Sequence, residues 1–288
     1  MTLGSESMKS LLDEYQKTKE FLVCIDSDGC AIDTMDIKHI KCFGPCMVKE
    51  WHLEEWQEAI LKSWNDVNLY TLTRGINRFK GLETALVEVN EKYRKIEGLD
   101  TFVKWVNETT ELSNESLKKE LENVKNICLK KALDWSIAVN KCIDELSEED
   151  KKPFEGVKEA LAEVSQYADV AIVSSANRKA VEDEWSKSSL LEHVNIVMTQ
   201  DIGVKSYCIE KLIEKGYSKD KVLMVGDAVG DLKAAQKNGV MFYPIMVKKE
   251  TYSWKRFISE VIPSLVEGRY GKEFEERFIN EFKENLTK

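Results

Sequence analysis

The chain has 288 residues, of which 43% are hydrophobic and 9% are aromatic, a composition that argues against a disordered or collagen-like chain. The formal net charge of −9 does not favour a nucleic-acid-binding protein, because a broad nucleic-acid surface requires a basic face. No apolar run approaches the ~20 residues of a membrane span. The first 20 residues also lack the basic start and apolar core of a secretion signal. We therefore expect a cytoplasmic protein without a membrane partner.

The seven cysteines predict no metal site. Cys42 and Cys46 lack the second cysteine or histidine pair that would complete a zinc site. Four other cysteines lie in apolar patterns and are expected to be reduced, buried thiols: Cys24, Cys128, Cys142 and Cys208.

The first predicted element is a strand over 21–25, a short apolar run typical of a buried parallel strand. From 36 to 152 the apolar residues recur at helical spacing, which predicts an all-α segment. Five of the seven tryptophans lie in this segment, and large aromatic residues favour a small separate helical core. An aromatic lid over a ligand is the alternative.

After Pro153, helices and strands alternate. We predict helices over 155–167, 178–187, 205–215 and 230–238, and strands over 169–173, 195–199, 221–226 and 240–245. Such alternation predicts a three-layer α/β fold, in which helices cover both faces of a parallel, Rossmann-like sheet. One or two amphipathic helices are expected over 250–288. The predicted domains are an α/β core of 1–35 and 153–288, and an inserted helical domain of 36–152.

Polar groups follow the predicted strands at the edge where ligands bind in open α/β sheets. They are Asp26, Asp28, Ser174, Ser175, Lys205, Asp227 and Asp231. Read one at a time, Ser174 could be a turn residue, Lys205 a solvated lysine, and the last two aspartates helix caps. Together they predict one site with at least three carboxylates, a hydroxyl and an ammonium group.

Asp26 and Asp28 are two residues apart, so in an extended chain both carboxylates face the same side, with Ser27 turned away. Their repulsion calls for a cation or a shared proton, and Mg²⁺ is the expected ion beside a phosphate. An EF-hand calcium loop is excluded, because Cys30, Ala31 and Ile37 occupy positions that should carry a ligand, glycine and glutamate. Gly29, and likewise Gly226 and Gly230, indicate tight turns or close backbone approach.

These residues resemble the four motifs of the haloacid dehalogenase (HAD) superfamily, in the family's order. The matching segments are FLVCIDSDGCAIDT, DVAIVSSAN, Lys205 and VGDAVGDLKAAQKNG, and the resemblance covers about 20–35 and 153–247. It implies Asp26 as nucleophile, Asp28 as acid/base, Ser174 as a phosphate-binding hydroxyl and Lys205 as its charged partner. Asp26, Asp28, Asp227 and Asp231 would hold Mg²⁺. The insert lies where the family has a C1-type cap.

The resemblance implies a Mg²⁺-dependent phosphatase of the phosphoglycolate phosphatase or β-phosphoglucomutase-like branch, acting on a small phosphorylated metabolite. Asp28 favours phosphate esters, because the dehalogenases lack this second aspartate. Ser206 departs from the proline that often follows the motif lysine in that branch. A phosphomutase and a non-catalytic phosphate- or metal-binding regulator on the same fold are the alternatives.

A basic cluster in the insert is the candidate for substrate specificity. Arg74, Asn77, Arg78 and Lys80 surround Gly75. They either bind an anionic leaving group together with Ser175, or form a solvated helix start.

Overall fold

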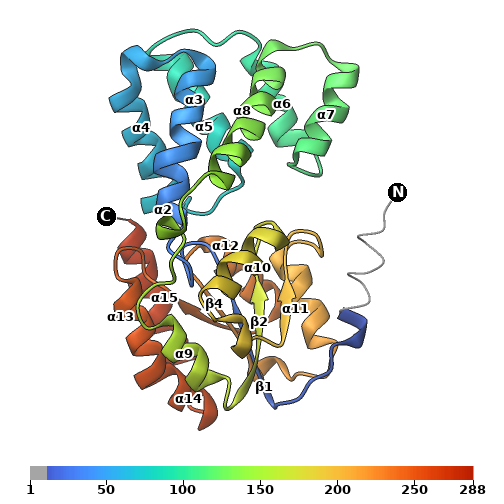
Figure 1. Ribbon diagram of the computed structural model, residues 1–288, viewed down its shortest axis with the longest axis vertical. Helices are drawn as coiled ribbons and strands as arrows, with labels where there is room; N and C mark the ends of the chain where they lie inside the picture. The colour runs from blue at the N-terminus through green and yellow to red at the C-terminus, as the bar shows by residue number, and fades with distance from the viewer. Residues whose placement is uncertain (1–11, 288) are drawn as a thin grey trace. The chain divides into compact units, whose positions relative to one another are not determined.

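The computed structural model describes residues 12–287, which divide into two compact units. The core unit comprises Met1–Thr34 and Glu148–Lys288, and the helical unit comprises Met35–Ser147. Figure 1 shows the elements of each unit. No described helix is both long enough and apolar enough to cross a membrane.

The core unit contains a five-stranded parallel sheet of order β3-β2-β1-β4-β5. Its strands are β1 (Phe21–Ile25), β2 (Ala168–Val173), β3 (Ile196–Met198), β4 (Val222–Gly226) and β5 (Met241–Pro244). Each lies within one or two residues of its predicted range, which confirms the α/β prediction. The central strand β1 pairs Val23 with Val170 on one side and with Leu223 on the other.

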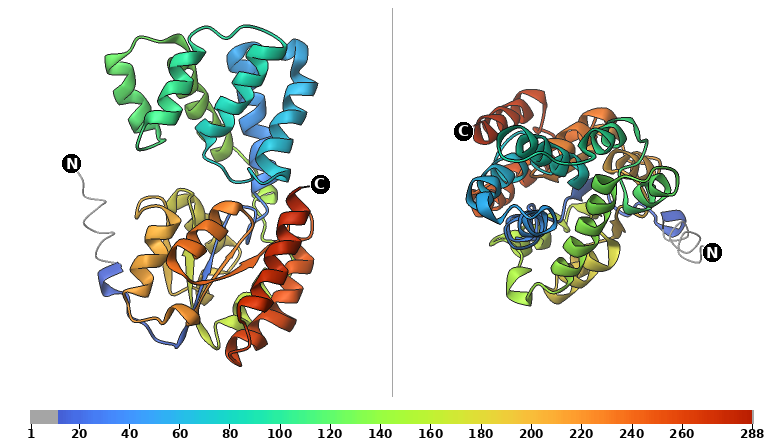
Figure 2. Two further views of the ribbon diagram at one scale, coloured as in Figure 1. Left: turned by 180° about the vertical axis from the view of Figure 1, so that it is seen from behind. Right: turned by 90° about the horizontal axis from the view of Figure 1, so that it is seen from above.

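Helices cover both faces of this sheet (Figure 2). Side chains alternate between the faces along each strand, so Val23 and Ile25 of β1 join the larger hydrophobic cluster. That cluster includes side chains of α9 (Val157–Val164), α10 (Arg178–Lys187), α13 (Glu250–Arg256) and α14 (Ile262–Val266). Helices α11 (Lys205–Ile213) and α12 (Val229–Asn238) cover the other face.

The C-terminal segment covers one edge of the sheet. Helix α15 (Lys272–Leu286) packs along β5, where Glu275 Oε1 accepts a hydrogen bond from the Phe242 amide at 2.8 Å. The Tyr270 hydroxyl donates to the Phe242 carbonyl at 2.7 Å. Both bonds satisfy edge groups that could otherwise pair with another chain. The segment forms α13, a π-helical turn, α14 and α15, rather than the one or two helices predicted.

The described elements of the helical unit are all helical. They are α2 (Met35–Lys38), α3 (Gly44–Trp51), α4 (Gln57–Asn65), α5 (Arg78–Lys92), α6 (Leu99–Glu108), α7 (Asn114–Asn123) and α8 (Ile127–Asp144), with short π- and 3₁₀-helical turns. Helix α2 continues through a π-helical turn directly into α3. The core of the unit is rich in aromatic side chains. The ring centroids of Trp64 and Trp135 are 6.1 Å apart and those of Phe79 and Trp105 are 5.2 Å apart, and both pairs are edge-on. The predicted tryptophan-rich helical core is therefore confirmed.

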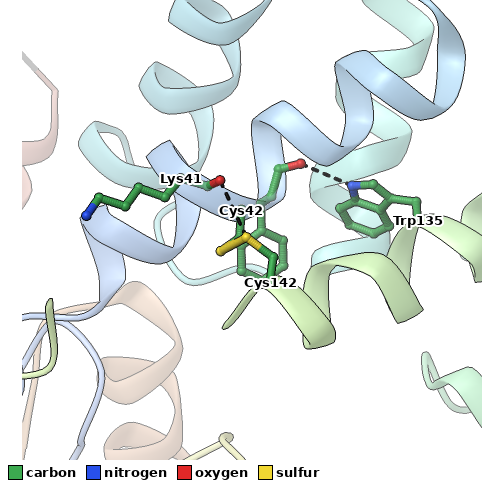
Figure 3. Close-up of a disulfide and its surroundings, with 5 residues drawn as sticks. Lys41, Cys42, Trp135 and Cys142 are labelled. Atoms are coloured by element: carbon green, nitrogen blue, oxygen red, sulfur yellow. Dashed lines mark hydrogen bonds between the residues drawn. A yellow bond between two sulfur atoms is a disulfide. The ribbon is translucent and has the colours of Figure 1, made fainter. Parts of the chain in front are cut away.

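A disulfide joins Cys42, in the π-helical turn His39–Phe43, to Cys142 near the end of α8 (Figure 3). Their Cα atoms are 5.6 Å apart, and beside them Trp135 Nε1 donates to the Phe43 carbonyl at 3.1 Å. The prediction of a reduced thiol at Cys142 was wrong, because helix packing brings together residues separated by 100 positions. Disulfides are typical of oxidising compartments, so this bond does not favour the cytoplasmic location, which stays a prediction.

Candidate active site

Three carboxylates meet where the chain leaves the central strands. Asp26 follows β1, Asp227 follows β4, and Asp231 lies in the first turn of α12. All three are buried, and one oxygen of each lies within 4.8 Å of an oxygen of the other two. The carboxyl ends of adjacent parallel strands share one edge of the sheet, which accounts for this meeting of distant sequence segments.

Lys205 bridges two of these carboxylates. Its Nζ lies 2.8 Å from Asp26 Oδ2 and 2.5 Å from Asp231 Oδ1. Burial alone would lower the pKa of Lys205, but the carboxylates of Asp231 and Asp26 raise it above its ordinary value. This charge balance explains how a lysine can begin α11, where the helix dipole disfavours a cation.

Burial raises the pKa of Asp26 to about 6, and the negative charges of Asp231 and Asp28 act in the same direction. Lys205 opposes this rise through its charge and its hydrogen bond. Burial and the charge of Asp227 likewise raise the pKa of Asp231. The cluster thus has more negative charge than one lysine neutralises.

Asp231 also stabilises the start of α12, as the third residue of the helix behind the N-cap residue Ala228. Its Oδ2 accepts a hydrogen bond from the Ala228 amide at 3.1 Å, while Oδ1 faces Lys205. A Cβ atom on Gly226 would lie 2.3 Å from the Asp231 carboxyl carbon, so no larger residue fits there. The prediction of close approach is confirmed for Gly226. At Gly230 such an atom would meet nothing within 4 Å, so close approach there stays a prediction.

The loop after β1 folds tightly around Ser27. Its carbonyl accepts hydrogen bonds from the amides of Ala31 and Ile32, both at 2.9 Å. Gly29 has φ of 77°, the left-handed region that favours glycine, and its amide donates to the Ile32 carbonyl at 2.9 Å. This turn keeps Asp26 and Asp28 in a short, internally bonded segment.

Thr34 orients Asp28. The Thr34 hydroxyl donates to Asp28 Oδ1 at 2.7 Å, and Thr34 is completely buried. The motif resemblance assigned no contact to this threonine. Asp28 and Thr34 both lie in the loop after β1, where neither the strand nor the helix period applies, so the sequence carried no signal for this bond.

The two serines after β2 differ in exposure. Ser174 is buried, its amide donates to the Met198 carbonyl at 3.0 Å, and its Oγ accepts from the Ala176 amide at 3.2 Å. Ser175 is exposed. The Ser174 hydroxyl thus has a local backbone partner, and phosphate binding by either serine stays a prediction.

Arg74 is not the solvated residue that one interpretation of the basic cluster required. It is 2% exposed, its guanidinium donates to the Leu69 carbonyl at 2.9 Å, and it lies 3.5 Å from the carboxylate of Asp36. The structure thus gives Arg74 a structural role inside the helical unit. Its substrate-binding role remains untested.

Asn77 and Arg78 also have partners within the helical unit. The Asn77 side chain accepts from the Phe79 amide at 2.9 Å and so caps α5. Arg78 donates to Asn140 at 2.6 Å and lies over the Phe43 ring at 5.1 Å, and burial lowers its pKa to about 10. The helix-start interpretation is confirmed for Asn77, and anion binding by both residues stays a prediction.

Comparison with known families assigns the chain to a class of protein. A family model for haloacid dehalogenase-like hydrolases matches residues 83–245, more than half of the chain. The chain therefore belongs to the haloacid dehalogenase-like hydrolase family. The matched segment includes Ser174, Lys205, Asp227 and Asp231, and begins after Asp26 and Asp28. No curated protein sequence matches the chain.

Solved structures of this family share the fold. A candidate phosphoglycolate phosphatase from Lactobacillus delbrueckii subsp. bulgaricus has a TM-score of 0.52 at 13% identity, with 88% of this chain and 100% of that one covered. A predicted phosphatase from Clostridium acetobutylicum has a TM-score of 0.50 at 14% identity, and the match covers 87% of this chain and 100% of that one. A haloacid dehalogenase-like hydrolase from Streptococcus pneumoniae has a TM-score of 0.50 at 11% identity, and the match covers 82% of this chain and 90% of that one.

Proposed function

We propose that this enzyme is a Mg²⁺-dependent phosphatase that hydrolyses a small phosphorylated metabolite through an aspartyl-phosphate on Asp26. In this proposal the core unit is the catalytic domain and the helical unit is its cap. The observation that carries it is the buried cluster of Asp26, Asp227 and Asp231, in which Lys205 bridges Asp26 and Asp231. Phosphatase names among the structural neighbours agree with this proposal.

The donor set of the cluster suits Mg²⁺. Its ligand atoms are all carboxylate oxygens, which hard cations prefer, and their negative charge exceeds that of Lys205. Asp26 and Asp227 would hold the ion together with the backbone carbonyl of Asp28. Both oxygens of Asp231 already accept hydrogen bonds, which supports a role for Asp231 in orienting Lys205. When bound, Mg²⁺ would neutralise charge on the phosphoryl oxygens.

In the first step, an oxygen of Asp26 attacks the phosphorus in line with the ester oxygen. The new bond joins this oxygen to phosphorus, and the bond between phosphorus and the leaving oxygen breaks. Asp28 gives its proton to the leaving oxygen, so the product departs as an alcohol. Thr34 supports this role because its hydroxyl fixes the orientation of the Asp28 carboxyl group.

In the second step, Asp28 accepts a proton from water as the water oxygen attacks the phosphorus. The bond between phosphorus and Asp26 breaks, which releases inorganic phosphate and restores the Asp26 carboxylate. Lys205 would stabilise negative charge on the phosphoryl oxygens, and the Ser174 hydroxyl would help to orient them.

The test is phosphate release from a broad panel of phosphorylated metabolites, with Mg²⁺ and with EDTA, by the wild type and by Asp26→Asn. We expect metal-dependent release that the substitution abolishes, because an amide cannot form the aspartyl-phosphate. Asp183→Asn, at an exposed position of α10, is the matched control and should keep full activity.

Retained steady-state activity in Asp26→Asn would remove Asp26 as the nucleophile. Interconversion of sugar phosphates without phosphate release would instead indicate a phosphomutase. A folded, Mg²⁺-binding protein without either activity would indicate a binding protein on the same fold.

A further inference from the structure

Two buried tryptophans hold the loop that carries Asp26 and Asp28. The Trp185 indole N–H, on α10, donates to the Ser27 hydroxyl at 2.9 Å. The Trp254 indole N–H, on α13, donates to the Cys30 carbonyl at 2.9 Å. Both tryptophans are fully buried, as are both acceptor residues.

These bonds lie on either side of Asp28 in the sequence, and the first is directly beside Asp26. Ser27 stands between Asp26 and Asp28, and Cys30 is two residues beyond Asp28. The Ser27 carbonyl accepts the amides that close the loop, so a shift of Ser27 would move the whole turn. The two indoles reach the loop from different helices and so restrain it at two points.

The helix that carries Trp254 is itself firmly placed. The neighbouring Ser253 accepts a hydrogen bond from the Tyr243 hydroxyl at its carbonyl, at 2.7 Å, and from the Met246 amide at its Oγ, at 3.0 Å. The ring centroids of Trp254 and Phe257 are 5.5 Å apart in an edge-on arrangement. The C-terminal segment thus connects the edge strand β5 to the loop after the central strand β1.

We propose that Trp185 and Trp254 are positioning residues, which fix Asp26 and Asp28 for phosphoryl transfer through their indole N–H groups. This inference rests on the proposed function. A displacement of about 1 Å in a reacting group lowers turnover on the order of 100-fold, so two hydrogen bonds to this loop would have a large effect.

The test compares Trp185→Phe and Trp254→Phe, which keep an aromatic ring and remove the N–H. Tyr270→Phe is the matched control, because it also removes one buried donor to a backbone carbonyl, away from the loop. Ser27→Ala removes the acceptor of the Trp185 bond with little change in volume. It therefore replaces Trp185→Phe if that variant does not fold.

The first readout is turnover of two substrates: p-nitrophenyl phosphate and the best alkyl phosphate of the panel. We expect kcat for the alkyl phosphate to fall about 10- to 100-fold in the tryptophan variants, with KM nearly unchanged. The loss for p-nitrophenyl phosphate should be smaller, because nitrophenolate leaves without the proton that a positioned Asp28 supplies. An equal loss for both substrates would indicate either displacement of Asp26 or a general loss of packing, and the second readout distinguishes the two.

The second readout is hydrogen–deuterium exchange of the full chain over residues 26–32, which requires no turnover. Exchange should become faster in the tryptophan variants and in Ser27→Ala, and remain unchanged in Tyr270→Phe. Unchanged exchange together with unchanged kcat would overturn the inference. A wild type that releases no phosphate would refute the proposed function, and the exchange rates would still decide whether the indoles hold the loop.

Discussion

Lys205 is the residue on which the charge balance of the site depends. It is the lysine that bridges Asp26 and Asp231, and all three side chains are largely withdrawn from water. Removing one partner of a buried ion pair lowers the free energy of unfolding much more than removing one partner of a surface pair. Lys205 therefore stabilises the fold as well as serving the proposed reaction.

We expect Lys205→Met to lower the free energy of unfolding by about 3–5 kcal/mol, because it leaves buried carboxylates without their cation. Millimolar Mg²⁺ should recover part of this loss by supplying positive charge to the same oxygens. Urea unfolding in EDTA and in Mg²⁺ measures both effects.

Lys211→Met is the control for this prediction, because Lys211 pairs with Glu214 at 2.7 Å on the surface of the same helix. It should unfold like the wild type in both buffers. Equally small effects of the two substitutions would show that the cluster does not need Lys205 for stability.

At the scale of elements, Asp169 joins the segment before β1 to β2. Its carboxylate accepts hydrogen bonds from the amides of Thr18 and Lys19 at 2.8 and 2.9 Å, and from the Tyr217 hydroxyl. Burial by itself would raise the pKa of Asp169, but the bonds from Thr18, Tyr217 and Lys19 lower it below its ordinary value of 3.8. The ionised form is therefore the one that the fold stabilises.

Because the folded-state pKa is lowered, Asp169 stabilises the protein fully above pH 3.8 and loses that effect as the pH falls through the folded-state pKa. We expect Asp169→Asn to lower the free energy of unfolding by about 2 kcal/mol at pH 7, since hydrogen bonds to a charged acceptor are strong. Chemical denaturation at several pH values should show the difference from wild type shrinking in acid. A difference that does not vary with pH would contradict this explanation.

At the scale of the whole molecule, residues 12–287 form two separate hydrophobic cores. The carboxylate cluster belongs to the core unit, and the Cys42–Cys142 disulfide belongs to the helical unit. The disulfide closes a loop of 100 residues, which spans nearly the whole helical unit. Metal and reductant should therefore act on different parts of the molecule.

We expect calorimetry to resolve two unfolding transitions. Mg²⁺ at about 100 times its dissociation constant should stabilise the core unit by about 2.7 kcal/mol, and Asp227→Asn should abolish that shift. Reductant should destabilise the helical unit by up to about 4–5 kcal/mol, and a Cys42→Ala, Cys142→Ala double variant should no longer respond to it. A single transition that both additives move would contradict the independence of the units.

Much of the core unit was predictable because its signals are local. Short apolar runs define the strands, and polar residues directly after them must gather at one edge of a parallel sheet. This logic alone placed Asp26, Asp227 and Asp231 near one another. The helices of the insert were predictable as well, because its apolar residues recur at helical spacing.

The remaining features depend on contacts between distant residues, which no local pattern encodes. The Cys42–Cys142 bond spans 100 residues, and the bond from Trp254 to Cys30 spans 224. The burial of Arg74, which lies in a turn, likewise follows from how the surrounding helices pack, since arginine is usually a surface residue. The amino-acid sequence by itself determined which chemical groups reach the sheet edge. Only tertiary packing decided which of them touch, because those contacts depend on where elements distant in the sequence lie in space.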